Sequence, residues 1–185
     1  MSELRLYMDL LESVGSSSKT MSMVKLPSGN NSFSPVLSSA LIQFHYGKLY
    51  KGYVDRYNNK EGDRSFNEAG AKLHELYFEQ FKTRSASNRP TGAILDLINR
   101  EFGNFADFRT AFAEAGSKVQ GSGWVYMNRS GKLKEIKNHR IPSDNVIIIV
   151  DMWEHAYQND YHSDKKKYID SLWKIVNWST INSRL

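Results

Sequence analysis

Apolar residues recur at helical intervals in the first half of the chain. Residues 35–58 carry apolar side chains three or four positions apart, the spacing of an amphipathic helix. Within this segment His45, Leu49 and Tyr53 recur every four residues, so they are predicted to share one face. A second helix is predicted over about residues 67–82, after a short polar turn. Its apolar face consists of Gly70, His74, Tyr77, Phe78 and Phe81. So short a turn predicts an antiparallel helical hairpin.

The pattern changes to strand-like runs beyond residue 120. Asn128-Arg129-Ser130-Gly131 separates two such runs and predicts a β-hairpin. A third, fully apolar run predicts a strand that is buried on both faces. The predicted helices lie at 92–102, 105–118 and 164–177, and the predicted strands at 121–127, 132–137 and 146–150. This order of elements predicts an α+β fold, in which a C-terminal lobe contains a three-stranded antiparallel sheet with flanking helices.

Three segments are predicted from these patterns: an N-terminal extension (1–25), a helical hairpin domain (26–86) and an α+β domain (87–185). The extension contains Glu3, Asp9 and Glu12, whereas transit peptides are poor in acidic residues. It also lacks the continuous apolar core of a signal peptide. The cytoplasm is therefore the default compartment, and an organelle stays open as an alternative because of the extension.

Composition narrows the classes of function. The chain has 185 residues and a net charge of +5, and 40% of its residues are apolar. This apolar fraction is typical of a globular protein and excludes a disordered chain. No stretch approaches the roughly 20 apolar residues that cross a bilayer, so no membrane partner is expected. The basic run at 165–167 has no interleaved aromatic residues, which favours a solvated helix face over nucleic-acid binding. The absence of cysteine excludes disulfides and thiolate metal sites.

Candidate chemistry begins where the buried strand ends. Asp151 follows that strand directly and His155 lies four residues later. A carboxylate in such a position is costly unless it is paired or binds a cation. Taken alone, this segment is better explained by Asp151 capping the next helix and His155 packing in the core. His45 and His74, on the apolar faces of two paired helices, change that balance. Together the four residues offer three imidazoles and one carboxylate, a set suited to iron, zinc or manganese.

Two kinds of chemistry fit such a set. A metal-bound water would be a nucleophile in a zinc hydrolase, whereas a metal with two oxidation states would serve a redox reaction. The chain has no His-Glu-x-x-His arrangement to supply a general base. Glu154 adjoins His155, but neighbouring residues on a helix point about 100° apart. These observations favour redox chemistry.

From about Leu26 to its C-terminus the chain resembles the iron/manganese superoxide dismutases. The run Asp151-Met152-Trp153-Glu154-His155-Ala156-Tyr157 is highly specific for this family, and both earlier histidines precede it at fitting places. The other matching segments are Phe44-His45-Tyr46-Gly47-Lys48 with Tyr53, Phe66-Asn67 with His74, Phe102-Gly103-Asn104-Phe105, Gly121-Ser122-Gly123-Trp124 and Asn177-Trp178.

The resemblance implies a metal centre and a reaction. One iron or manganese ion per subunit would be held by His45, His74, Asp151 and His155, with a solvent molecule as fifth ligand. The implied reaction is the disproportionation of superoxide to oxygen and hydrogen peroxide. In that reaction the metal is alternately reduced and oxidised.

The resemblance also implies residues that support the centre. Tyr53 corresponds to the gateway tyrosine of the substrate funnel and would relay protons. Most family members have a glutamine that touches the metal-bound solvent, from one of two positions. One of these positions is Gly70 here, so His139, at the other, is the candidate for that role. Trp124 and Trp153 correspond to aromatic residues that wall the site.

An assembly is implied as well. Glu154 corresponds to a residue that reaches across a dimer interface to the ligand histidine of the other subunit, and Ser122 is placed at the same interface. The implied partner is therefore a second copy in a two-fold homodimer, with a tetramer as the larger alternative.

Two departures from the family leave other functions open. Leu49 and Gln158 stand where the family usually has a histidine and a tyrosine, which meet across the interface and help to relay protons. One alternative is therefore a non-enzymatic metal-binding relative with a disabled proton relay. Another is a zinc hydrolase that uses the same four ligands.

Overall fold

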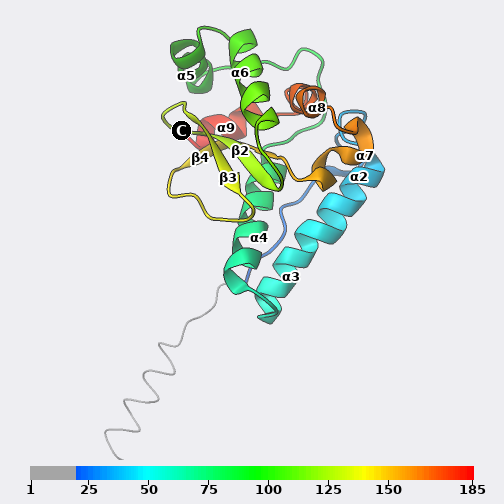
Figure 1. The fold of residues 1–185 in the computed structure, drawn as a ribbon. Coiled ribbons are helices and arrows are strands. Elements are labelled where there is room, and N and C mark those ends of the chain that lie inside the picture. Colours follow the sequence, from blue (N-terminus) through cyan, green and yellow to red (C-terminus); the bar gives the residue numbers. More distant parts are fainter. Residues whose placement is uncertain (1–19) are drawn as a thin grey trace, which may run out of the picture.

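The computed structural model describes residues 20–185, so most of the predicted N-terminal extension lies outside the described residues. A helical hairpin follows the short strand β1 (Pro27–Asn30). Its first arm is one continuous helix in three sections, and its second arm is α4 (Arg64–Glu79) (Figure 1). The sections of the first arm are α2 (Ser39–Phe44), the π-helical segment η1 (His45–Tyr50) and α3 (Lys51–Asn59). The predicted hairpin is confirmed.

Both arms begin at residues other than those predicted. The first arm starts at Ser39 and not at Pro35, because residues 31–37 form turns and the Ser38 hydroxyl accepts the N–H of Leu41 at 3.1 Å. The second arm starts three residues before Asn67. Here the Asp63 carboxylate accepts the N–H of Phe66 at 3.0 Å and caps the helix.

The π-helical segment changes which side chains face inward. A π-turn holds more residues than an α-turn, so the four-residue repeat that predicted one face for His45, Leu49 and Tyr53 is interrupted. His45, Tyr50 and Tyr53 are buried, while Leu49 is only partly buried. The prediction that Leu49 shares the inner face is therefore wrong, and Tyr50 takes its place.

The C-terminal part contains a three-stranded antiparallel sheet with strand order β3-β2-β4, as predicted. The central strand pairs Trp124 with Ile136 on one side and with Asp151 on the other. The strands are β2 (Gly123–Asn128), β3 (Leu133–Lys137) and β4 (Val146–Asp151). The flanking helices are α5 (Ala93–Phe102), α6 (Phe105–Ser117), η2 (Glu154–Ala156), α7 (Gln158–Tyr161), α8 (Lys165–Leu172) and α9 (Trp178–Ser183).

The helix predicted over residues 164–177 ends earlier, at Leu172, and the separate short helix α9 (Trp178–Ser183), which was not predicted, follows a turn. Residues 173–177 leave the helix and bond to the end of the hairpin. The Ile175 carbonyl accepts the N–H of Lys82 at 2.7 Å, and the N–H of Asn177 donates to the Gln80 carbonyl at 2.7 Å. These non-local bonds satisfy the backbone better than one longer helix would, since that helix would leave the hairpin end unpaired.

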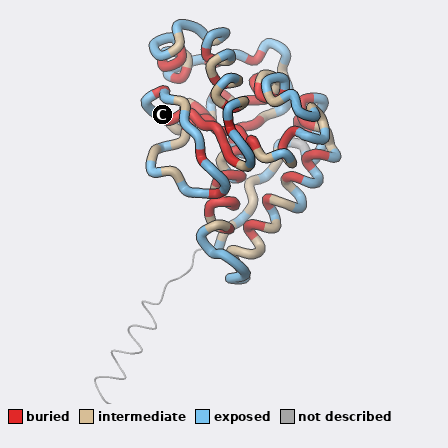
Figure 2. The backbone as a smooth tube through the Cα atoms, viewed as in Figure 1, coloured by how far each residue is buried: buried red, intermediate tan, exposed pale blue. Residues whose placement is uncertain are grey.

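The core lies where α4 meets the sheet, and buried residues concentrate there (Figure 2). Gln80 is fully buried and joins the two parts: its amide nitrogen donates to the Ile149 carbonyl at 2.5 Å, and its oxygen accepts the Ile149 N–H at 3.1 Å. None of the helices in the described part of the chain has the length and apolar character needed to span a bilayer.

Candidate metal centre

Four side chains from distant segments converge in the core. His45 lies at the start of η1, His74 on α4, Asp151 at the end of β4 and His155 in η2. Their candidate ligand atoms all lie within 4.8 Å of one another. Asp151 Oδ2 is 3.1 Å from His45 Nε2, 3.6 Å from His74 Nε2 and 3.3 Å from His155 Nε2. The structure thus brings together all four residues predicted to be ligands.

These four atoms fit a bound metal ion. Each of them is buried and has no hydrogen-bond partner, an arrangement that is costly unless something else satisfies the atoms. Imidazole and carboxylate bonds to first-row metals are about 2.1 Å long, and such bonds separate neighbouring ligand atoms by about 3.0–3.6 Å. The three distances from Asp151 Oδ2 to the histidine nitrogens match that range. The donor set, three imidazole nitrogens and one carboxylate oxygen, is suited to iron or manganese.

Backbone groups orient two of the ligands. His74 Nδ1 lies 2.6 Å from the Gly70 carbonyl oxygen, to which only a protonated nitrogen can donate, so Nε2 carries the lone pair. The N–H of Trp153 donates to Asp151 Oδ1 at 2.8 Å and leaves Oδ2 facing the histidines. The sequence alternative, in which Asp151 caps the following segment, is thus partly correct, because one carboxylate oxygen does so while the other faces the centre.

Burial controls the charge of the ligands. Desolvation lowers the pKa of His45. The pKa of His74 is lowered well below its ordinary value, first by desolvation and then by the charge of the neighbouring His45. Both imidazoles are therefore neutral at pH 7 and available to a metal. Burial opposes ionisation of Asp151, but His155 and His45 outweigh it and hold the pKa of this carboxyl below its usual range. Burial and the neighbouring charges thus favour the metal-binding forms of His45, His74 and Asp151.

His139 lies beside the four ligands and is 4% exposed. Its Nδ1 accepts the indole N–H of Trp124 at 3.2 Å, and its Nε2 is buried with no partner. Burial lowers the pKa of His139 to about 4. Because the indole is only a donor, the neutral ring must carry its proton on Nε2. His139 therefore holds a hydrogen-bond donor in the buried cluster.

Tyr53 closes the cluster on the side of the hairpin. Its ring centre is 4.7 Å from that of His139 and 5.3 Å from that of His74. Burial, followed by the charge of Asp151, raises the pKa of its hydroxyl, so Tyr53 stays protonated at neutral pH. A Cβ atom at Gly70 would lie 2.8 Å from this ring. Glycine at this position therefore provides the space that Tyr53 occupies.

Both predicted tryptophans line the cluster. Trp124 is fully buried, and its ring meets that of His74 edge-on with centres 5.0 Å apart. Trp153 stacks on His139 with ring centres 4.6 Å apart. Apolar rings around the ligands exclude bulk water and strengthen the electrostatic interactions inside.

The predicted interface residues lie on the surface above His155. This ligand is 15% exposed at its side chain, whereas His45, His74 and Asp151 are fully buried. A surface pocket beside it is lined by Gly121, Ser122, Trp153, Glu154, His155, Tyr157 and Lys165. Glu154 is exposed, so its carboxylate is available to another molecule.

Two tyrosines in the site were not predicted there. Tyr50 stacks on His74, with ring centres 5.7 Å apart and planes 10° apart. Tyr77 stacks on His45 at 5.4 Å, and its hydroxyl lies 2.8 Å from that of Tyr168. The apolar spacing placed Tyr77 on the inner face of its helix without indicating its contact. No pattern in the surrounding sequence indicates that Tyr50 faces the site, because the π-turn that brings it inward has no simple sequence signal.

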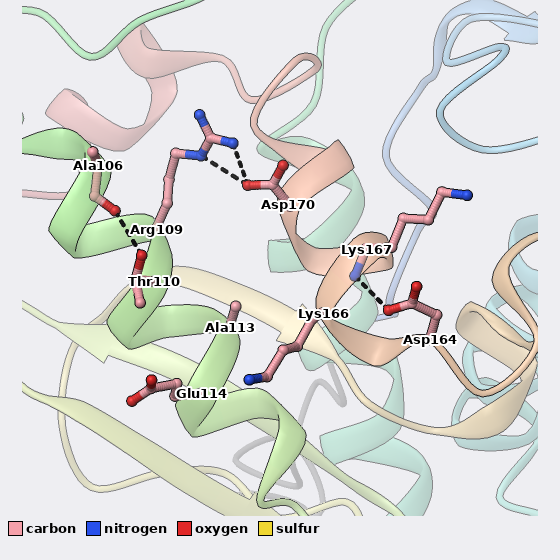
Figure 3. A pocket seen from close by; sticks show the side chains of 9 residues that line it. All are labelled: Ala106, Arg109, Thr110, Ala113, Glu114, Asp164, Lys166, Lys167 and Asp170. Carbon is pink, nitrogen blue, oxygen red and sulfur yellow. Dashed lines mark hydrogen bonds and ion pairs between the residues drawn. The ribbon is translucent and has the colours of Figure 1, made fainter.

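Lys166 and Lys167 of the basic run line a separate surface pocket between α6 and α8 (Figure 3). Arg109 and Asp170 form an ion pair there, and the Asp164 carboxylate accepts the N–H of Lys167 at 2.9 Å. The side chains of Lys166 and Lys167 are exposed on α8, as the interpretation of a solvated helix face predicts.

Comparison with known proteins gives the family. Residues 90–184 match the iron/manganese superoxide dismutases, C-terminal domain. A superoxide dismutase (Fe) of Bacteroides fragilis is 34% identical over 192 residues, which cover 90% of this chain and 100% of that protein. A superoxide dismutase (Mn/Fe) of Porphyromonas gingivalis is 32% identical, over 89% of this chain and 99% of that protein. A superoxide dismutase (Fe) of Escherichia coli K12 is 31% identical, over 86% and 95%.

The chain belongs to the iron/manganese superoxide dismutase family. It is therefore an oxidoreductase that uses iron or manganese. The family, the fold class and the metal predicted from the sequence are confirmed. The zinc hydrolase alternative loses its support, because the relatives are named for iron or for manganese and iron.

Proposed function

We propose that the chain disproportionates superoxide, with His45, His74, Asp151 and His155 as the metal ligands. The observation that carries this assignment is the convergence of four buried atoms that have no hydrogen-bond partner. When bound, iron or manganese supplies a one-electron couple, which takes an electron from one superoxide and gives it to another. The protein holds the ion in a set of neutral imidazoles and one carboxylate, which leaves the centre positive and attractive to an anion.

Peroxide formation needs two protons. We assign their relay to Tyr53, whose hydroxyl takes up a proton from solvent for each one that it passes on, and we assign to the neutral His139 the role of a hydrogen-bond donor through Nε2. Both groups are protonated on the relevant atom at neutral pH, Tyr53 at its hydroxyl and His139 at Nε2. Both lie at the edge of the ligand cluster, and Tyr53 is 8% exposed, so it can exchange protons with solvent. Trp124 and Trp153 keep the rest of the cluster dry.

The test compares metal content with catalysis. Protein loaded with iron or manganese should consume superoxide in stopped-flow decay in proportion to its metal, and metal-free protein should not. His74→Ala should lose both metal and activity, because it removes one of four ligands. Lys48→Ala is a matched control, since Lys48 is exposed on the same hairpin. Full metal content and full activity in His74→Ala would contradict the ligand assignment.

A non-enzymatic metal-binding protein is the second candidate function. Gln158 is exposed, and the partly buried Leu49 has no ionisable group, so neither can relay a proton as histidine and tyrosine do in the family. Protein that binds one metal ion per chain but consumes superoxide no faster than the free metal would support this candidate. In that case Leu49→His with Gln158→Tyr should restore catalysis.

We further propose a homodimer, in which Glu154 of each subunit reaches the His155 of the other, with Ser122 nearby. The exposure of Glu154 and of the His155 edge supports this assembly, as does the adjoining pocket. Light scattering should give the dimer mass for the wild type and a weaker dimer for Glu154→Ala. The cytoplasm is the compartment we propose, and cell fractionation tests it.

A further inference from the structure

Arg56, in the last turn of α3, lies beside Tyr53. Its guanidinium carbon is 4.9 Å from the centre of the Tyr53 ring, and its Nε–H donates to Asn67 Oδ1 at 2.9 Å. Asn67 is buried on α4, and its amide donates in turn to the Glu61 carbonyl at 2.9 Å. The Arg56 side chain is therefore held between the two arms of the hairpin and does not extend freely into solvent.

Two glycines leave space for this arrangement. A Cβ atom at Gly52 would lie 3.0 Å from Arg56 Nη1, and one at Gly70 would lie 2.8 Å from the Tyr53 ring. The guanidinium and the ring thus both pack closely on helix backbone. Such packing limits the positions that either group can take.

The charge of Arg56 is not neutralised by a neighbour. Within residues 20–185, no carboxylate oxygen lies within 4 Å of its guanidinium, and the adjacent Asp55 pairs with Lys51 at 2.5 Å. An aromatic face stabilises a cation without cancelling its charge. Because Arg56 is 4.9 Å from the Tyr53 ring and that ring is 5.3 Å from His74, the charge lies within about 10 Å of a metal ligand.

We propose that Arg56 is a positioning residue for the dismutase reaction: its guanidinium fixes Tyr53 and supplies a positive potential that draws the anionic substrate to the centre. This inference rests on the proposed function. A unit charge at about 10 Å changes the encounter rate of an anion about two- to fivefold at low ionic strength. The effect should nearly vanish at 0.5 M salt, where the screening length is about 4 Å.

The chain offers a matched control. The Arg64 guanidinium carbon is also 4.9 Å from the centre of a tyrosine ring, that of Tyr57, and Arg64 Nη2 donates to the Tyr57 hydroxyl at 3.2 Å. Tyr57 is one helical turn beyond Tyr53, toward the end of the hairpin. Arg64→Gln therefore removes the same charge and the same kind of contact at a greater distance from the ligands.

The experiment measures superoxide decay and azide affinity of the metal-loaded protein between 10 mM and 0.5 M salt. Arg56→Gln should lower kcat/KM and weaken azide binding two- to fivefold at 10 mM, with little difference at 0.5 M. Arg56→Lys should recover most of the azide affinity, and Arg64→Gln should match the wild type. Asn67→Asp adds a carboxylate beside Arg56, so it should reproduce the loss even if Arg56→Gln does not fold.

Three results would overturn the proposal. The first is unchanged azide affinity in Arg56→Gln. The second is a loss of azide affinity in Arg56→Gln that is independent of salt and is not recovered by Arg56→Lys. Such a loss would mean that Arg56 acts only through its packing and not through its charge. The third is an equal loss in Arg64→Gln, which would mean a general effect of net charge. Loaded wild-type protein without dismutase activity would contradict the proposed function instead, and the azide titration would still decide the role of Arg56.

Discussion

Replacing Gly70 with alanine adds one methyl group at the point where α4 meets the ring of Tyr53. That methyl carbon would lie 2.8 Å from Cγ and Cδ1 of the ring and 3.1 Å from Cε1, whereas ordinary contacts begin at 3.4 Å. The ring must therefore move by about 0.6 Å. It has little room to do so, because it is 8% exposed and meets the rings of His139 and His74.

The free energy of unfolding should fall as a result. Overpacking of a core costs about 1–3 kcal/mol, while alanine in place of glycine within a helix contributes about 0.5–1 kcal/mol of stability. We expect Gly70→Ala to be less stable than the wild type by about 1–2 kcal/mol. Gly47→Ala is the matched control, since no atom lies within 4 Å of its added carbon, and it should be neutral or slightly stabilising.

Urea unfolding of the metal-free protein measures both variants. In a Tyr53→Ala background the ring is absent, so Gly70→Ala should lose its cost and show a coupling of at least about 1 kcal/mol with Tyr53. A Gly70→Ala protein as stable as Gly47→Ala would refute the reasoning. So would an unchanged cost in the background without the ring.

Three further predictions concern His139, Gln80 and the metal. The pKa of His139 is about 4 in the folded protein, below the ordinary value of about 6.5, so the unfolded chain binds the extra proton. His139 alone should therefore account for a fall of about 2–3 kcal/mol in the stability of the metal-free protein as the pH drops from 7.5 to 4.5. His45 and His74, whose pKa values are also lowered, add to that fall. The difference in free energy of unfolding between the two pH values, measured with urea, should be smaller by about 2–3 kcal/mol in His139→Gln. Gln80→Leu leaves both peptide groups of Ile149 unpaired and should lower the free energy of unfolding by about 2–4 kcal/mol; an unchanged urea midpoint would contradict this role. Chelation should lower the melting temperature, and added iron or manganese should restore it. At a free metal concentration a hundredfold above Kd, the bound metal should add about 2.7 kcal/mol to the free energy of unfolding. Equal melting curves with and without metal would contradict the site.

Local patterns were enough to predict most of the fold. Helices and strands with regular apolar spacing appear close to their predicted ranges, because the residues that form them are neighbours in the chain. Asp63 and Ser38 set helix starts through side-chain caps, which shift the predicted boundaries by a few residues. The convergence of the four proposed ligands was predictable because the resemblance included the segments that carry them.

The remaining features depend on contacts between distant residues. Tyr50 faces His74 only because a π-turn adds a residue to the helix. Gln80 meets Ile149 across 69 positions of sequence, and Arg56 meets Asn67 on the other arm of the hairpin. No periodicity along one segment indicates such pairs. They become visible only once the elements are packed together.

The distribution of the four ligands has a consequence for biosynthesis. His45 and His74 belong to the hairpin, whereas Asp151 leaves the ribosome about a hundred residues after His45, which takes roughly 5–20 s at 5–20 residues per second. Once His74 has been made, and until Asp151 follows, the nascent chain carries only two of the four proposed ligands, both of them imidazoles. All four proposed ligands are present only after Asp151 and His155 have been synthesised. Any discrimination between iron and manganese by the full set of four therefore has to follow the synthesis of the C-terminal part of the fold, long after the two hairpin histidines are in place.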